Sequence, residues 1–111
     1  MKYLYSGVSL KNGRCLNMDS LLLINGHIDK KKALLAVVCD GVGSMPEGDY
    51  ASGAAARLLN GWFSTVTSTE KAGLRMRDAI LDINTRIVAE AKQKNIETAS
   101  TLSALLLIER D

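Results

Sequence analysis

The residue best suited to chemistry is Asp40, which ends a run of apolar residues and begins a turn rich in glycine. Residues 37–43 read Val-Val-Cys-Asp-Gly-Val-Gly. A carboxylate at the end of a buried strand is held by a rigid scaffold, and glycines let a ligand approach the backbone closely. The segment therefore suits a metal ion or a phosphate group, although on its own it is better explained by a simple Asp-Gly turn. It has neither the Gly-Lys-Ser/Thr of a Walker loop nor the glycine spacing of a dinucleotide site.

A second polar cluster lies upstream at residues 14–19, which read Arg-Cys-Leu-Asn-Met-Asp. Arg14 offers a planar, permanently charged group for phosphate, and Asp19 offers a second carboxylate. Alone, this cluster is better explained by a surface loop with an ion pair. A joint site for metal or phosphate requires a fold that brings the two clusters together.

The strands that could position these residues follow from the hydrophobic pattern. Residues 21–24 form a short apolar run, and residues 33–39 and 102–108 form longer ones that predict strands buried on both faces of a sheet. Residues 3–10 form a weaker strand candidate. The pair Asn25-Gly26 predicts a hairpin turn, because both residues tolerate positive φ, and a polar stretch follows it.

Two helices are expected before the last strand. Apolar residues recur at helical spacing from Ala51 to Phe63, after a capping-box pattern, Ser-x-x-Glu, at residues 44–47. A second apolar stripe predicts a helix from about residue 69 to residue 94. Charges at i,i+4 intervals from Asp78 to Lys94 predict a solvated helix face. The order β-β-β-α-α-β predicts an α+β fold in which helices cover a sheet.

Composition predicts one ordinary domain that spans residues 1–111. The formal charge of +2 at pH 7 argues against a nucleic-acid-binding protein. The two cysteines are too few for a disulfide framework and lack the spacing of a metal site. The first residues lack the apolar stretch of a signal peptide, and no apolar run approaches the ~20 residues that cross a bilayer. We therefore expect a cytoplasmic protein without nucleic-acid or membrane partners, in which His27 and the lysines at 30–32 are solvated.

Three sequence blocks, taken in order, resemble a known enzyme family. Residues 14–20 read Arg-x-x-Asn-Met-Asp-Ser; residues 38–44 read Val-Cys-Asp-Gly-Val-Gly-Ser, with Glu-Gly-Asp-Tyr-Ala-Ser following at 47–52; and residues 98–104 read Thr-Ala-Ser-Thr-Leu-Ser-Ala. They are similar to the Arg-x-x-Asn-Glu-Asp-Ser, Ala-Asp-Gly-Met-Gly-Gly, Gly-Glu-x-Ala-Ser and Gly-Thr-Thr-Leu-x-Ala motifs of the metal-dependent type 2C protein Ser/Thr phosphatases. The chain thus resembles the N-terminal half of a bacterial member of that family.

The resemblance implies a layered β-sandwich flanked by antiparallel helices, with two Mg²⁺ or Mn²⁺ ions at its edge. It implies that Asp40 bridges both ions, that the backbone carbonyl of Gly41 binds one of them, and that Asp19 holds metal-bound water. It also implies that Arg14 binds the phosphate of a phosphoserine or phosphothreonine in a phosphorylated protein substrate. Hard cations prefer oxygen ligands, and paired ions stabilise both the attacking and the leaving oxygen.

Two departures from the family pattern leave alternatives open. Met18 stands where the family has a glutamate ligand, and a thioether is too soft to replace a carboxylate on these ions. The later aspartates of the family's site have no counterpart up to Asp111. The leading hypothesis is a phosphatase whose chain continues beyond this point and whose fragment is inactive alone. The alternatives are a catalytically inactive interaction module, and a small α/β domain in which Arg14, Asp19 and Asp40 lie far apart.

Half of a sandwich would also leave one sheet uncovered. An uncovered sheet exposes apolar area and unpaired strand edges, which other chains can cover. The resemblance therefore predicts a homodimer, or an exchange of strands between two chains.

Overall fold

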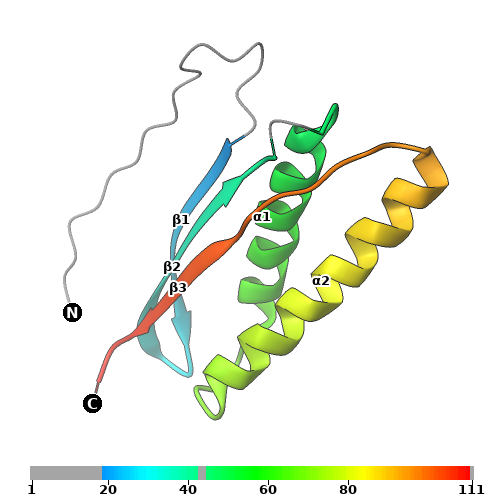
Figure 1. Ribbon diagram of the computed structural model, residues 1–111. Coiled ribbons are helices and arrows are strands. Elements are labelled where there is room, and N and C mark those ends of the chain that lie inside the picture. The colour runs from blue at the N-terminus through cyan, green and yellow to red at the C-terminus, as the bar shows by residue number, and fades with distance from the viewer. Residues whose placement is uncertain (1–18, 43–44, 111) are drawn as a thin grey trace.

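The computed structural model describes residues 19–42 and 45–110, and within them it is an α+β fold (Figure 1). Two strands, β1 (Asp19–Ile28) and β2 (Lys31–Asp40), precede two helices, α1 (Gly48–Thr65) and α2 (Ala72–Lys94). A third strand, β3 (Ser103–Ile108), ends the described part. The predicted helices and the three later strands are confirmed, whereas the candidate strand at 3–10 lies outside the described residues.

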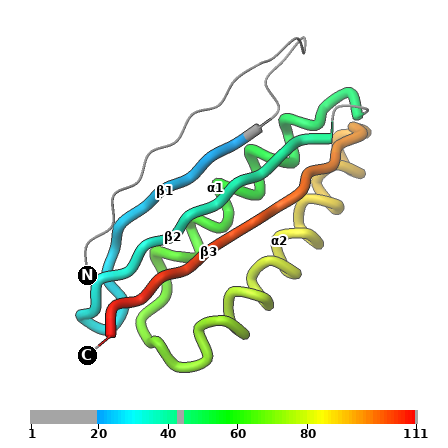
Figure 2. The backbone as a smooth tube through the Cα atoms, turned by 60° about the vertical axis from the view of Figure 1, so that its left-hand side comes forward, coloured from blue at the N-terminus to red at the C-terminus, as the bar shows by residue number. Residues whose placement is uncertain are grey.

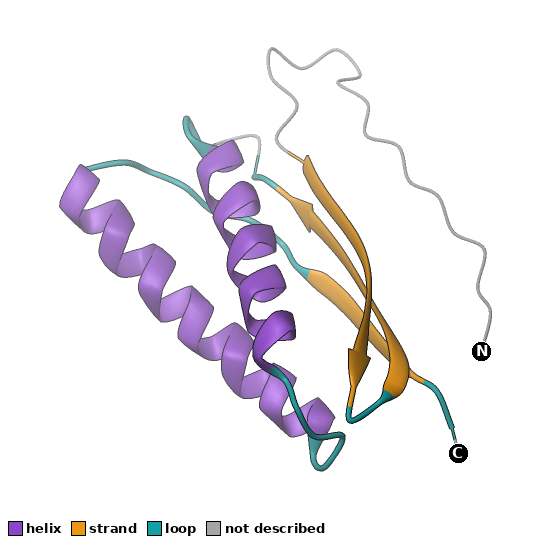
Figure 3. Ribbon diagram, turned by 180° about the vertical axis from the view of Figure 1, so that it is seen from behind, coloured by secondary structure: helices purple, strands orange, loops and turns teal. Residues whose placement is uncertain are grey.

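The three strands form one antiparallel sheet in the order β1-β2-β3, and they run side by side in Figure 2. Both helices lie on the same side of this sheet (Figure 3). Helix α1 packs directly against β1 and β2, and α2 packs against α1. Within the described residues, therefore, the architecture is a two-layer arrangement of helices on a sheet. None of the helices there is long and apolar enough to cross a membrane.

The hairpin between β1 and β2 turns at Asp29 and Lys30, whose φ angles are 51° and 65°. Positive φ at both central residues fits a two-residue hairpin turn. The sequence-based prediction of a turn at Asn25-Gly26 was wrong, because both residues lie inside β1, where Gly26 pairs with Ala33.

Close packing explains why a glycine stands inside this strand. A Cβ added to Gly26 would lie 3.0 Å from Cε2 of Phe63, which is tighter than nine in ten real contacts, so the ring would have to move. Phe63 belongs to α1 and is buried. The glycine thus makes room for an aromatic ring that crosses from the helix layer to the sheet, rather than permitting a turn.

The core lies between the sheet and the helices. Alternate residues of β2 face the helices, and Leu35 and Val37 among them are 0% and 1% exposed. Small residues of α1 let its backbone approach the sheet, while Leu59 and Phe63 fill the space between them. Helix α2 contributes less, since Ile83 is its one buried residue. The core residues are Ile28, Ala33, Leu35, Val37, Cys39, Ala55, Ala56, Leu59, Phe63 and Ile83.

Among residues 19–42 and 45–110, no helix lies on the opposite face of the sheet (Figure 3). Val38 and Leu105 are 50% and 53% exposed there, and Leu21, which pairs with Val38, is 38% exposed. The prediction that β2 and β3 are buried on both faces was therefore wrong for Val38 and Leu105, whereas Leu34 on this face is 5% exposed. The apolar runs are continuous because both faces are apolar, yet the two helices cover only one of them.

The charge ladder predicted along α2 is solvated only in part. Asp78 forms an exposed ion pair with Arg77 at 3.2 Å. Further along, the hydroxyl of Tyr50 on α1 donates a hydrogen bond to Glu90, and the Nζ of Lys94 lies 4.9 Å from the centre of the Tyr50 ring. The end of this ladder thus ties α2 to the start of α1 instead of facing water alone.

Candidate functional site

The two acidic positions singled out in the sequence meet at one end of the sheet. Asp19 and Asp40 are direct partners in the antiparallel pairing of β1 and β2. This pairing sets the backbones of the two residues side by side. The fold therefore brings together two carboxylate residues that are 21 positions apart in the chain (40 − 19).

The segment before β3 holds the backbone of Asp40 from the other side. The N–H of Thr101 donates to the carbonyl oxygen of Asp40 at 2.9 Å, and the N–H of Asp40 donates to Oγ1 of Thr101 at 3.2 Å. The Ser100 hydroxyl donates to the same carbonyl at 3.3 Å. Two hydroxyl residues thus fix the strand end that carries the exposed Asp40 carboxylate.

The direction of the Gly41 carbonyl follows from the same pairing. Gly41 and Ser100 form an antiparallel bridge, flanked by hydrogen bonds from Thr101 to Asp40 and from Val42 to Ala99. In a bridge flanked in this way, the N–H and C=O groups of the two central residues point away from each other. The Gly41 carbonyl is therefore directed toward the side of β2 on which β1 and Asp19 lie.

The third motif block also meets the beginning of α1. The Thr98 hydroxyl donates to the carbonyl oxygen of Glu47 and accepts the N–H of Ala51 at 2.9 Å. The N–H of Glu47 donates to the carbonyl oxygen of Glu97 at 3.1 Å. Thr98, from a distant part of the chain, thus bridges the N–H of Ala51 and the carbonyl oxygen of Glu47, two groups that bond directly to each other in a regular helix.

The predicted capping box is not what caps this helix. Helix α1 begins at Gly48, and the residue before it, Glu47, makes no capping hydrogen bond through its side chain. The carboxylate of Glu47 instead accepts the N–H of Glu97 at 3.3 Å. Ser44, the other member of the predicted box, lies outside the described residues.

Of the four site residues predicted from the sequence, three lie in the part of the chain that the structure describes. Asp19, Asp40 and Gly41 lie at one end of the sheet in the backbone register. Arg14 and Met18 lie outside the described residues. The positioning roles of Ser100 and Thr101 were missed, and the available signal was a pair of hydroxyl residues directly before an apolar run.

The donors at this sheet end are all oxygens of the kind that Mg²⁺ and Mn²⁺ bind. Two carboxylate residues and one backbone carbonyl fit such ions in chemistry, but Mg²⁺ takes six ligands in a near-ideal octahedron. Among the described residues, no group of three His, Cys, Asp or Glu side chains could hold a metal ion. Further oxygens, from water or from other residues, would have to complete the coordination.

Cys39, next to Asp40, takes no part in this site. It alternates onto the helix face of β2 and is fully buried, and this burial raises the pKa of its thiol. A thiol with a raised pKa is protonated at neutral pH and is a poor nucleophile and metal ligand. The chemistry available at this end of the sheet is therefore that of hard oxygen donors.

A groove of about 950 Å³ lies on the helix side of the same region. Its walls are α2 and the segment that leads into β3, with Ile83, Ile87 and Leu102 among the lining residues. The lining is mostly apolar. This groove and the acidic sheet end are separate features, since Asp40 and Gly41 do not line it.

The resemblance to the type 2C phosphatases depends only on the three sequence blocks. The third block and the second block without residues 43–44 lie in the described part of the chain and meet at the Asp40 end of the sheet, where Asp19 from the first block pairs with Asp40. No family model, no curated protein and no solved structure matches the chain.

Proposed function

We propose that this chain carries the first ligands of the metal site of a phosphoprotein phosphatase that acts on phosphoserine or phosphothreonine. The observation that supports the proposal most is the pairing of Asp19 with Asp40 at one sheet end. Two acidic residues in direct backbone register offer a divalent cation two carboxylates from neighbouring strands. The Gly41 carbonyl, directed toward the same side, adds a third oxygen.

Each residue has a role in this proposal that follows from its chemistry. The Asp40 carboxylate and the Gly41 carbonyl hold Mg²⁺ or Mn²⁺, and Asp19 orients water by accepting its hydrogen bonds. Arg14 binds two phosphate oxygens through its planar guanidinium group. Bound divalent cations supply a polarised phosphoryl group and a water of lowered pKa. Thr101 and Ser100 act as positioning residues, because they fix the backbone of Asp40.

The proposal also concerns the rest of the fold. In the proposed family the described sheet is one layer of a β-sandwich, and a second sheet packs against its uncovered face. The two helices then flank the sandwich from the side that they already occupy. The remaining metal ligands would come from residues other than Asp19, Asp40 and Gly41.

Met18 favours a second function, a phosphatase-like module that binds partners without catalysis. Methionine occupies the position where the resembled family has a glutamate ligand, and its sulfur is a poor ligand for hard cations. Met18→Glu distinguishes the two functions. If the site is otherwise intact, the added carboxylate tightens Mn²⁺ binding at least about tenfold, since each charged oxygen ligand strengthens such a site. An unchanged affinity supports the inactive module.

Mn²⁺ titration by calorimetry, paired with phosphatase assays, tests the proposed function. We expect Asp40→Asn to weaken Mn²⁺ binding at least about tenfold. The matched control is Asp29→Asn, which removes the same charge from the turn at the other end of the hairpin, where asparagine tolerates the positive φ. Turnover of a phosphopeptide that Asp40→Asn abolishes supports the enzyme. Mn²⁺ binding that both variants weaken equally contradicts the proposal.

A further inference from the structure

Basic residues from three separate segments gather at one end of the described domain, the basic end. The turn between β1 and β2 lies there beside the connection from α1 to α2, and β3 ends close to them, as Figure 1 and Figure 3 show. Seven basic and four acidic residues belong to this end, so that its net charge is +3 (7 − 4). The basic residues are Lys30, Lys31, Lys32, Lys71, Arg75, Arg77 and Arg110, and the acidic residues are Asp29, Glu70, Asp78 and Glu109.

The opposite end of the domain, where Asp19 pairs with Asp40, has an excess of acidic residues. Six acidic residues and two basic residues belong to it. These are Asp19, Asp40, Glu47, Asp49, Glu90 and Glu97, with Lys92 and Lys94. A negatively charged partner is therefore attracted to the basic end and repelled by the end that carries the paired aspartates.

Two of the lysines stand where the backbone favours other residues. The φ angle is 65° at Lys30 and 53° at Lys71, in the left-handed region that glycine and asparagine adopt most easily. Local stability alone would place one of those two residues at the tip of each turn. The fold thus keeps a positive charge at both tips at a cost to its stability, which is typical of functional positions.

We propose that the basic end binds an extended, acidic segment of a partner protein. Lys30 and Lys71, both exposed, receive carboxylates of the segment at the tips of the two turns. Arg75, in the first turn of α2, adds a third exposed cation. Leu74 is 53% exposed and adds an apolar contact beside Arg77, since residues three positions apart are neighbours on a helix.

The mixture of charges favours a peptide over a uniformly charged surface. Asp29 and Glu70 directly precede Lys30 and Lys71 in the two turns, and Asp78 forms an ion pair with Arg77 at 3.2 Å. A lipid surface or a nucleic-acid backbone would meet these acidic residues together with the basic ones, whereas a peptide can place its carboxylates on the cations alone. One exposed leucine is also a small apolar area for a membrane anchor.

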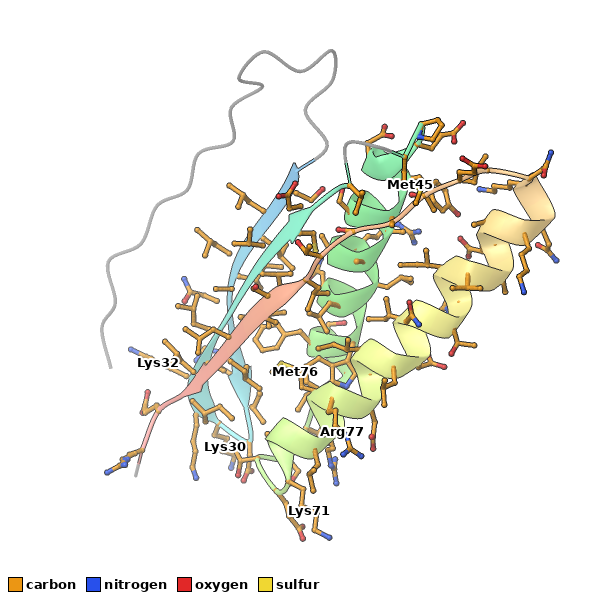
Figure 4. The ribbon with its side chains drawn as sticks, in the orientation of Figure 1. Lys30, Lys32, Met45, Lys71, Met76 and Arg77 are labelled. Atoms are coloured by element: carbon orange, nitrogen blue, oxygen red, sulfur yellow. The ribbon has the colours of Figure 1, made fainter. Side chains whose placement is uncertain are left out.

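The place of the basic end in the fold keeps it accessible. Figure 4 shows Lys30, Lys71 and Arg77 at the end of the two layers, and not on a face of the sheet. A second sheet packed on the open face would therefore leave both turns exposed. The proposed metal site lies at the opposite end, so that the two proposals are independent of each other.

Fluorescence anisotropy with a labelled oligoglutamate of about ten residues tests the proposal, in EDTA and about 50 mM salt. We expect the wild-type chain to bind this peptide, and about 500 mM salt to weaken the binding at least tenfold, because exposed charges are screened. The double variant of Lys30→Asn and Lys71→Asn should weaken binding about tenfold at low salt. Because asparagine tolerates the left-handed backbone, this variant should keep or raise the midpoint of thermal unfolding.

The matched control combines Arg57→Gln with Lys92→Gln, which removes two exposed positive charges outside the basic end. It should change the affinity by less than about twofold. Equal weakening by the two double variants overturns the proposal, as does a wild-type chain that does not bind the peptide at up to about 500 µM. Tighter binding to phosphatidylglycerol vesicles than to the peptide also overturns it and assigns the basic end to a lipid surface. A lower unfolding midpoint in the lysine variant overturns the cost ascribed to Lys30 and Lys71.

Discussion

The two faces of the sheet are almost equally apolar and yet lie in different surroundings. On the helix face, Leu35 is 0% exposed beneath α1, whereas Leu105 on the open face is 53% exposed. Both residues belong to uninterrupted apolar runs. An apolar run therefore predicts that a strand has two faces suited to burial, but it does not reveal what covers each of them. The open face marks where further packing is expected.

The comparison extends to the candidate site. Cys39 and Asp40 are neighbours in β2 and alternate onto opposite faces, so that the thiol is buried while the carboxylate is exposed. The acidic end therefore belongs to the open face, at its rim. Burial of the helix face stabilises the sheet, and the carboxylate of the candidate site is exposed on the opposite face.

The largest expected effect comes from matched leucine truncations on the two faces. Leu35→Ala should reduce the free energy of unfolding by about 2–5 kcal/mol, because it leaves a cavity in a closed core. Leu105→Ala should cost less than about 1 kcal/mol in the monomer, since half of this side chain already contacts water. Urea denaturation at a concentration where the chain is monomeric measures both. Equal losses would show that the two faces do not differ.

A second prediction concerns the close approach within the helix face. Gly26→Ala should destabilise the protein by about 1–3 kcal/mol, because the new methyl group meets the Phe63 ring. Gly53→Ala on α1 is the control, since a Cβ there meets nothing within 4 Å and alanine favours the helix by up to about 1 kcal/mol. Thermal unfolding of the two variants should give shifts of opposite sign. A neutral Gly26→Ala would contradict the packing described.

A third prediction concerns the joint between α1 and the segment before β3. Thr98→Val keeps the shape of the side chain and removes the hydroxyl that binds Ala51 and Glu47, so we expect a loss of about 1 kcal/mol. Thr85→Val on the exposed side of α2 should change stability by less than about 0.5 kcal/mol. Urea denaturation compares them. If Thr98→Val is as mild as its control, the hydroxyl does not stabilise the joint between α1 and the segment before β3.

The smallest expected effect depends on pH and involves Tyr50 and Glu90. The hydrogen bond from Tyr50, together with nearby Lys94, Arg57 and Arg86, lowers the pKa of Glu90, against a smaller opposing effect of desolvation. A carboxyl whose pKa is lowered on folding adds stability above its ordinary pKa, and that stability is lost as the pH falls through the lowered value.

Tyr50→Phe should therefore raise the pKa of Glu90 toward its ordinary value and make stability depend less steeply on acidic pH. A carboxyl NMR titration of Glu90 in both proteins measures this shift. Since Glu90 is only half-buried, solvent screens its interactions, and the effect on stability at neutral pH should be slight. An unchanged pKa would mean that the Tyr50 contact does not persist in solution.

The local hydrophobic pattern was enough to predict the helices and the strands. The features that it did not predict depend on contacts between residues far apart in the chain. The stripe from Met76 to Ile87 predicted α2 because packing and helical period agree there. The prediction of a turn at Asn25-Gly26 was wrong because glycine is favoured both in turns and at sites of close packing. The cause at Gly26 is the Phe63 ring, which lies 37 positions away in the chain (63 − 26).

In the candidate site, too, local pattern identified the residues, whereas long-range contacts determine how they are arranged. Asp40 was identified from its place at a strand end, and Asp19 from its motif block, but their register depends on where the hairpin turns. A turn at Asn25-Gly26 would have paired other residues. The support from Thr101 could not be anticipated, since it comes from a hydrogen bond between residues 61 positions apart.

Paramagnetic broadening by Mn²⁺ tests the central claim most directly, because it locates the cation on the chain. In two-dimensional amide NMR spectra, substoichiometric Mn²⁺ should first broaden the signals of Asp40, Gly41 and Thr101, and leave those of Asp29 and Lys30 sharp. Asp40→Asn should abolish this pattern, and Asp29→Asn should preserve it. Broadening that begins elsewhere, or that Asp40→Asn leaves unchanged, would contradict a cation site at the paired aspartates.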